Sequence, residues 1–291
     1  MTLLLLDTDL GSGISDAVAL AYLLAHPQCE LLGITTAGPQ PDRRARLAAA
    51  LCQEAGAAVE VYAGRGSPLI ATAHSSEAHL AFILENQFEP SETPRGRAIP
   101  FMIDTIRAHP GEVTLLCLGP LTNAAALFAA DEEAPGLLKS LVTRCGVFDY
   151  GSAEVDTLDV NTQWDPYAAA LVYQSALRQH RSVGLEAAGR LLLPAHEVRL
   201  LFQTRRLKPI LDLAEIWFRQ RPEVTFNDSL AAALVFEPEL CEYERGTVRV
   251  ELESEWMAGL THWTPGMQGP HEIALPADPQ RFFLHFFSLL E

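Results

Sequence analysis

Short apolar runs that read as buried strands recur along the first two thirds of this 291-residue chain, with helix-like stretches between them. The strand-like runs are 3–9, 31–36, 59–64, 113–119, 140–148 and 182–187. The helix-like stretches are 16–25, 41–55, 100–108, 121–130 and 166–177. This alternation predicts an α/β fold with a mostly parallel central sheet and helices on both faces.

The pattern changes from about residue 189. Helical stretches are expected over 194–221 and 227–235, followed by one strand at 247–251 and a final helix after Asp278. No internal repeat, low-complexity tract or Gly/Ser linker separates this part from the rest. We therefore expect one domain over residues 1–291, with a helical C-terminal third packed on the same sheet.

Composition excludes two classes of partner. A formal charge of −16 and the lack of a basic stripe argue against nucleic acid. No apolar run approaches the ~20 residues that span a bilayer. The five cysteines are widely spaced and form no CxxC pattern, and no basic segment precedes the short apolar run at the N-terminus. We expect a cytoplasmic protein with reduced cysteines and a small-molecule partner.

Three acids surround the first turn of the chain. Asp7 and Asp9 end the first predicted strand, a glycine-containing elbow follows, and Asp16 begins the next helix. Working residues of open α/β sheets gather at the carboxyl ends of the strands. These acids have two interpretations: a helix cap with two turn acids, or carboxylate ligands of Ca²⁺ or Mg²⁺.

Three later helix starts also carry polar side chains. They lie in "LGPLTNAAAL" (118–127), "DVNTQWDPYAAAL" (159–171) and "TFNDSLAAAL" (225–234). Each alone is a satisfactory capping sequence. Four such helix starts in one α/β chain favour a shared site at one edge of the sheet.

With these motifs, the sequence resembles the inosine/uridine-preferring nucleoside hydrolase family. The resemblance covers essentially the whole chain. It rests on the Asp-rich N-terminal motif, "GITT" (33–36), "GPLTN" (119–123), "NTQWDPYAA" (161–169), "NDSLAAA" (227–233) and "ADPQRFF" (277–283). It implies hydrolysis of the N-glycosidic bond of a nucleoside, with Ca²⁺ as the cofactor, and a homodimer or homotetramer.

The resemblance also implies a metal shell. Asp9, Asp16 and Asp228 are the expected carboxylate ligands, and Leu118 is expected to add its backbone carbonyl. Asp9 is in addition the expected general base. The chemistry agrees, since a cation held by oxygen ligands promotes deprotonation of water, and a carboxylate can take the proton as the water attacks an oxocarbenium-like carbon.

Substrate contacts implied by the resemblance are less regular. Asn161 is expected to bind a sugar hydroxyl, and Asp159 stands where the family usually has a glutamate. Trp164, His262 and Trp263 are candidates for contact with the base. His74 and His79, together with His262, are candidates for the acid that protonates the leaving group.

Several positions depart from the family pattern, and three of them concern expected contacts with the substrate. Ser15 replaces an acid that usually contacts a ribose hydroxyl, Pro39 replaces an asparagine, and Asn227 replaces a histidine next to the third metal ligand. We hypothesise a metal-dependent hydrolase with eroded sugar and base contacts. Two alternatives stay open: a binding or regulatory protein without turnover, and an unrelated phosphatase-like enzyme using Asp7 or Asp9 as nucleophile.

Overall fold

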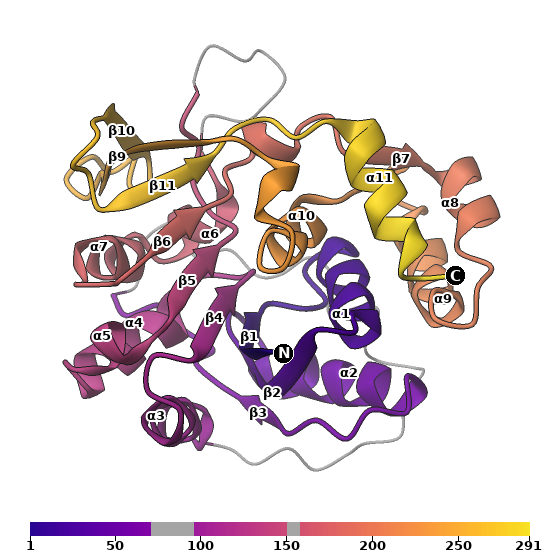
Figure 1. Ribbon diagram of the computed structural model, residues 1–291, viewed down its shortest axis with the longest axis horizontal. Helices are drawn as coiled ribbons and strands as arrows, with labels where there is room; N and C mark the ends of the chain where they lie inside the picture. The colour runs from indigo at the N-terminus through magenta and orange to yellow at the C-terminus, as the bar shows by residue number, and fades with distance from the viewer. Residues whose placement is uncertain (71–95, 150–157) are drawn as a thin grey trace.

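A nine-stranded sheet forms the centre of the molecule (Figure 1), in a computed structural model that describes residues 1–70, 96–149 and 158–291. The strand order is β10-β9-β11-β6-β5-β4-β1-β2-β3. The strands of this sheet are β1 (Thr2–Thr8), β2 (Cys29–Thr36), β3 (Val61–Ala63), β4 (Val113–Cys117), β5 (Ser140–Thr143), β6 (His180–Ser182), β9 (Tyr243–Val250), β10 (Thr261–Pro265) and β11 (His271–Ala274). A separate two-stranded sheet pairs β7 (Leu192–Pro194) with β8 (Glu223–Thr225).

The sheet is mostly parallel, as predicted. Every pair from β3 across to β11 is parallel, and only β9 pairs in antiparallel fashion, with β11 and β10. Parallel strands are buried on both faces, which explains the unbroken apolar runs. All five residues of β4 are buried. In β1, Leu4 and Leu6 enter one hydrophobic core while Leu5 enters the other.

Helices cover both faces of the sheet, which confirms the predicted fold class (Figure 1). One face carries α1 (Ser15–Ala25), α2 (Pro41–Glu54), α9 (Lys208–Trp217), α10 (Asn227–Ala233) and α11 (Pro279–Ser288). The other carries α3 (Ala98–Ala108), α4 (Thr122–Ala130), α5 (Ala134–Leu137) and α7 (Pro166–Gln174). The remaining helices are α6 (Val160–Trp164) and α8 (Ala195–Leu201), with 3₁₀ turns at Glu186–Ala188 and Pro238–Leu240.

The C-terminal third contains more strand than the sequence suggested. One strand was expected at 247–251, but β9, β10 and β11 all extend the central sheet. The sequence of β9, YERGTVRV, carries three charged residues, so its apolar signal is weak. Charges are typical of strands near the edge of a sheet. The strand predicted at 182–187 is also wrong, because β6 ends at Ser182 and a 3₁₀ turn follows.

The strand order places a crevice between β1 and β4. From β1 the chain first builds outward through β2 and β3, then returns to place β4 on the opposite side of β1. Ligands of open α/β sheets bind where the order reverses in this way, beyond the carboxyl ends of the strands. Asp9 follows β1 and Leu118 follows β4, and the Leu118 N–H donates to the Asp7 carbonyl at 2.8 Å.

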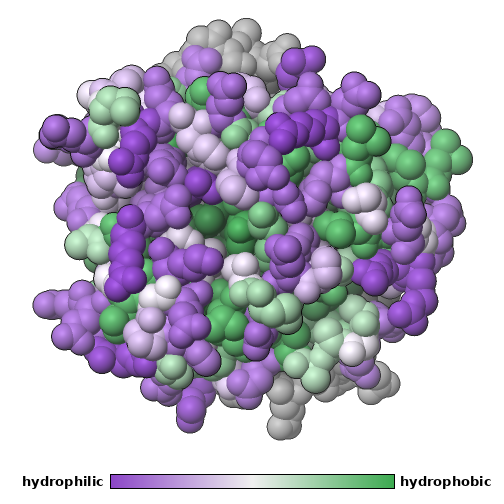
Figure 2. All heavy atoms as spheres, in the orientation of Figure 1, coloured by the Kyte–Doolittle hydropathy of each residue, from purple (hydrophilic) through white to green (hydrophobic). Residues whose placement is uncertain are grey.

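The surface is largely hydrophilic around the periphery of the face shown in Figure 2, with hydrophobic side chains also exposed at the edge formed by α8. Leu200 and Leu201 of that helix are 74% and 41% exposed. Across the described ranges, no helix has both the length and the apolar character needed to cross a membrane.

Candidate functional site

A cavity of about 490 Å³ lies beyond the carboxyl ends of the central strands. It collects residues from the β1–α1 loop, the loop after β2, the loop after β4, the segment 158–164 and the start of α10. Eight of the residues singled out from the sequence line it: Asp9, Ser15, Asp16, Pro39, Asn161, Trp164, Asn227 and Asp228. The structure thus brings together side chains that are more than 200 positions apart in the chain.

Asp9 is held against the loop that follows β4. A Cβ atom added at Gly119 would lie 2.7 Å from the Asp9 backbone nitrogen and 2.9 Å from its Oδ1 atom. Only glycine fits at such a distance, which is the physical reason for the first residue of the GPLTN motif. Two other residues of the motif are structural: Asn123 donates to Asp7 at 2.7 Å, and Thr122 donates to Asp165 at 2.9 Å.

Asp16 is buried in the first turn of α1, where the helix dipole favours a negative side chain. Burial raises the pKa of Asp16 well above its ordinary value, and the nearby charges of Asp228 and Asp9 add to the increase. The Thr8 hydroxyl donates to Asp16 Oδ1 and partly offsets this effect. Three carboxylates therefore lie close enough to disfavour one another's charge.

Asp228 occupies the first turn of α10 and is also buried. Burial raises the pKa of Asp228, while the charge of Arg144 and a hydrogen bond from Ser15 act in the opposite direction. The Arg144 Nε atom lies 3.2 Å from Asp228 Oδ1. Ser15, which replaces an acid of the family motif, thus contacts a predicted metal ligand.

Arg144 is the main residue of the cavity that sequence reasoning missed. Its side chain is 10% exposed, and its Nη1 atom also donates to the fully buried Asp159. Burial opposes its charge, but Asp159, Asp228, Asp9 and Asp16 together raise its pKa. One signal was available: Arg144 is a lone charge in the apolar run 140–148, where a buried charge requires a partner.

Asn161 and Leu118 are joined directly. The Asn161 side-chain amide donates to the Leu118 carbonyl at 2.7 Å and to the Arg144 carbonyl at 3.0 Å. The Leu118 side chain is buried in the core, as expected for a residue that would act through its backbone. Leu118 itself is not among the residues that line the cavity.

Asp159 and Asp165 both cap helices. Asp159 accepts from the N–H groups of Asn161 and Thr162 at the start of α6, and Asp165 accepts from Ala168 at the start of α7. Asp159 does not line the cavity. Its contact with the cavity is indirect, through Arg144.

Trp164 borders the cavity with an unsatisfied donor. Its indole Nε1 atom is buried and has no hydrogen-bond partner in the part of the chain that the structure describes. A buried indole N–H usually finds an acceptor, so the unsatisfied donor of Trp164 is unusual.

The predicted C-terminal contacts lie elsewhere. His262 and Trp263 are on β10 and do not line the cavity. The His262 ring lies 3.5 Å from Glu251, and the Trp263 indole donates to Glu244 at 2.9 Å. His74 and His79 lie outside the described residues. The structure therefore does not bring His262 or Trp263 to this cavity.

The donor set matches a hard divalent cation in charge and chemistry, because Asp9, Asp16 and Asp228 present carboxylate oxygens to one cavity. Protein donors already contact Asp16, Asp228 and the Leu118 carbonyl. Within residues 1–70, 96–149 and 158–291, no group of three or more His, Cys, Asp or Glu side chains has the arrangement of a metal site. The chemistry of these carboxylates therefore suits a cation, although their positions do not form a metal site and Arg144 already contacts Asp228.

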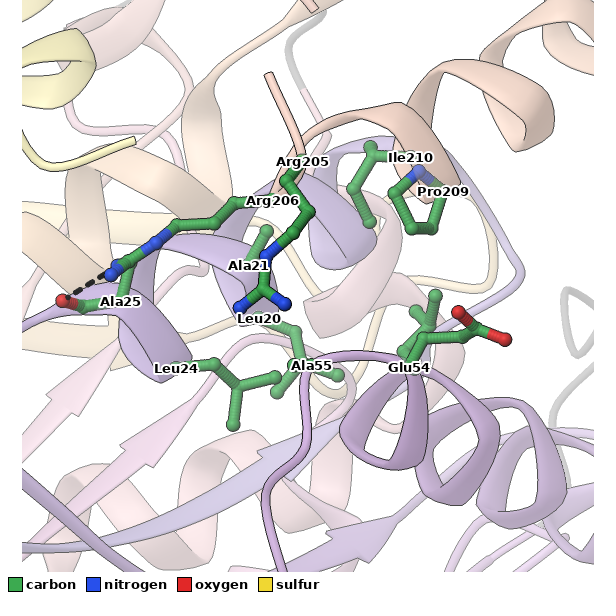
Figure 3. A pocket seen from close by; sticks show the side chains of 11 residues that line it. Leu20, Ala21, Leu24, Ala25, Glu54, Ala55, Arg205, Arg206, Pro209 and Ile210 are labelled. Carbon is green, nitrogen blue, oxygen red and sulfur yellow. Dashed lines mark hydrogen bonds between the residues drawn. The ribbon is translucent and has the colours of Figure 1, made fainter. Parts of the chain in front are cut away.

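A second pocket, of about 120 Å³, lies between α1, α2 and the segment before α9 (Figure 3). Apolar side chains such as Leu20 and Leu24 form its wall, with Arg205 and Glu54 at its margin. Arg206 donates to the Ala25 carbonyl at 3.2 Å. This pocket is smaller and lacks a convergent set of carboxylates, so we assign the functional site to the larger cavity.

Glu186 provides a test of buried charge beside the site. Burial raises the pKa of Glu186 from 4.5 to about 7. The folded chain therefore binds this proton more tightly than the unfolded chain, and the stabilisation present below about pH 4.5 is lost as the pH rises to 7. Through Glu186, the free energy of unfolding of the wild type should fall by about 2 kcal/mol between about pH 5 and 8. Glu186→Gln should not show this decrease, and urea unfolding across that pH range measures it.

The exposed Glu112→Gln is the matched control for this experiment. It changes the same functional group on the surface and should leave the pH dependence of the unfolding free energy unchanged. A wild-type slope retained in Glu186→Gln would show that Glu186 does not bind the proton.

Comparison with known proteins places these features in a family. Residues 4–283 match the family model described as inosine-uridine preferring nucleoside hydrolase. The non-specific ribonucleoside hydrolase RihC of Salmonella enteritidis is 30% identical over 270 residues, covering 89% of this chain and 86% of that protein. Probable uridine nucleosidase 1 of Oryza sativa is 27% identical over 270 residues, covering 86% and 81%.

Two solved structures share the fold. The purine-preferring ribonucleoside hydrolase from Gardnerella vaginalis superposes with a TM-score of 0.82 at 21% identity, covering 99% of this chain and 98% of that one. The inosine-uridine preferring nucleoside hydrolase from Bacillus anthracis gives a TM-score of 0.81 at 21% identity, covering 100% and 99%. At this level of identity the likeness concerns the fold.

Proposed function

Since this chain belongs to the inosine-uridine preferring nucleoside hydrolase family, whose members hydrolyse the N-glycosidic bond of nucleosides, we propose that the 490 Å³ cavity hydrolyses a nucleoside or a related N-riboside in a Ca²⁺-dependent reaction. One observation carries the proposal: Asp9, Asp16 and Asp228 meet at one cavity, at the point where the strand order reverses.

In the proposed mechanism Asp9 is the general base. Its carboxylate lines the cavity and accepts a proton from the water that attacks the anomeric carbon, as the sugar gains oxocarbenium character. The nucleobase leaves with the electron pair of the broken glycosidic bond and takes a proton from solvent. Asp9, Asp16, Asp228 and the Leu118 carbonyl would hold Ca²⁺, which supplies Lewis acidity and neutralises the three carboxylates. Arg144 would keep Asp228 oriented.

The substrate side of the cavity has few groups suited to a ribose. Ser15 already donates to Asp228, and the Asn161 amide already donates to two backbone carbonyls. Pro39 has no side-chain donor. Trp164 and Asn227 remain as groups that could contact the base. A site whose buried groups match a hydroxyl rejects the analogue lacking it by on the order of 10⁴-fold, and this site lacks several such groups.

We therefore expect poor activity on common ribonucleosides and little preference for ribose over 2′-deoxyribose. The measurement is kcat/KM for inosine, uridine and their 2′-deoxy counterparts, with saturating Ca²⁺ and with a chelator. Efficient hydrolysis of a ribonucleoside, with its deoxy form rejected on the order of 10⁴-fold, would contradict the interpretation of Ser15 and Pro39.

A second candidate function is ligand binding without turnover. It is favoured by the contacts of Arg144, a residue that lines the cavity and pairs with Asp228 and Asp159. Calorimetry with the same nucleosides distinguishes the two functions: binding without release of free base supports the second candidate, and release of free base and sugar excludes it.

We also propose that residues 1–291 form one domain, supported by a central sheet whose strands run from Thr2 to Ala274. The homodimer or homotetramer and the cytoplasmic location remain part of the same proposal. Light scattering coupled to size-exclusion chromatography tests the assembly.

A further inference from the structure

Arg144 is a buried cation placed among the carboxylates of the cavity. Its side chain is 10% exposed, and its two carboxylate partners, Asp159 and Asp228, are 0% and 3% exposed. The guanidinium lines the same cavity as Asp9 and Asp16. It therefore supplies a positive charge at the place where the proposed function puts a metal ion.

The contact with Asp228 opposes a metal in two ways. The Arg144 Nε atom, at 3.2 Å, donates to Oδ1 of Asp228, one of the two carboxylate oxygens that a cation could use. A positive charge next to Asp228 also repels a divalent cation, and this repulsion is strong in a buried site. The second guanidinium contact, with Asp159, prevents Arg144 from leaving Asp228 at low cost, because Asp159 would remain buried without its partner.

The backbone of Arg144 affects another predicted ligand. Its carbonyl and the Leu118 carbonyl accept from the same Asn161 amide, at 3.0 and 2.7 Å. This amide would have to share the Leu118 carbonyl with a metal ion. Arg144 thus contacts one predicted ligand with its side chain and is tied to a second through Asn161.

We propose that Arg144 is a built-in competitor of the divalent cation, which weakens metal binding at Asp228 and sets the Ca²⁺ concentration at which the site is loaded. The inference rests on the proposed function for the location of the metal. It assigns to Arg144 a role in setting metal affinity that neither the sequence motifs nor the comparisons give.

The test compares Ca²⁺ affinity in four proteins by isothermal titration calorimetry: wild type, Arg144→Met, Arg144→Met with Asp159→Asn, and Arg221→Met. The double variant also removes the charge of Asp159, so that Asp228, the predicted metal ligand, is the only one of the two carboxylate partners left without Arg144. Arg221 is the matched control, since it lines the same cavity but is exposed. Circular dichroism and Tm verify folding of each protein.

We expect both Arg144 variants to bind Ca²⁺ about 10–100-fold more tightly than wild type, the usual size of effects from groups next to metal ligands. Arg221→Met should change the affinity by less than about threefold, because exposed charges are screened. Equal or weaker binding in the folded double variant overturns the inference.

Hydrolysis is measured separately, so the two proposals can fail independently. An Arg144 variant that binds Ca²⁺ more tightly than wild type but hydrolyses no nucleoside supports the competitor role and counts against the enzymatic function. If none of the four proteins binds Ca²⁺, the metal site and the competitor role are both refuted, even where hydrolysis is observed.

Discussion

Asp9→Asn is expected to reduce kcat/KM for any hydrolysed nucleoside by about 10²–10⁴-fold, the contribution of a general base. The amide cannot accept the proton of the attacking water, and it is a weaker ligand for a hard cation. Because Asn has the same shape, the close packing of Asp9 against Gly119 should be retained. The loss should appear in the chemical step and persist at saturating Ca²⁺.

Asp212→Asn is a suitable control, since Asp212 lies on the surface of α9 and pairs only with Lys208 among its described neighbours. It should leave kcat/KM unchanged. Turnover near the wild-type value in Asp9→Asn would show that the base is another residue of the cavity. Asp16→Asn and Asp228→Asn would then identify it, by the pH dependence that each removes.

Arg44→Met is expected to lower the free energy of unfolding by about 3–5 kcal/mol, because it leaves the Pro39 and Leu10 carbonyls without their donor and removes one of the two donors to the Asp9 carbonyl. Arg44 is 3% exposed. It donates to the carbonyls of Pro39 at 2.7 Å and Leu10 at 3.1 Å, and also to the carbonyl of Asp9. It thereby joins the loop after β1 to the loop after β2.

Urea unfolding of Arg44→Met beside Arg43→Met provides the measurement. Arg43 is the preceding residue of α2, and its bond to Gln40 lies at the surface. The control should lose less than about 1 kcal/mol. A similarly small loss in Arg44→Met would mean that water replaces the guanidinium and that Arg44 does not hold the two loops together.

Much of the site could be found from the sequence, because each of its residues follows a strand or begins a helix in a local pattern. Asp9, Asp16 and Asp228 were singled out in this way, and they line one cavity. His262 and Trp263 were also singled out, and the structure places them outside that cavity. Their positions depend on how β10 joins the sheet edge, which no local pattern specified.

The edge of the sheet was harder to predict for a similar reason. β11 has four residues and β9 carries charges, so neither shows the long apolar run of a central strand. β11 pairs with β6 and with β9, and these pairings are decided by contacts between segments far apart in the chain. Short edge strands are partly exposed, and the hydrophobic pattern is weakest where burial is incomplete.

By itself the sequence determined the α/β class, the parallel core and the acid-bearing ends of its strands, because the periodicity of buried residues and the chemistry of helix starts are local properties. Only the tertiary structure decided the partners of those acids. In the sequence Arg144 is a single charged residue within an apolar run, yet the fold places it between Asp159 and Asp228. A buried charge needs a partner, and which residues can reach it depends on how the whole chain packs.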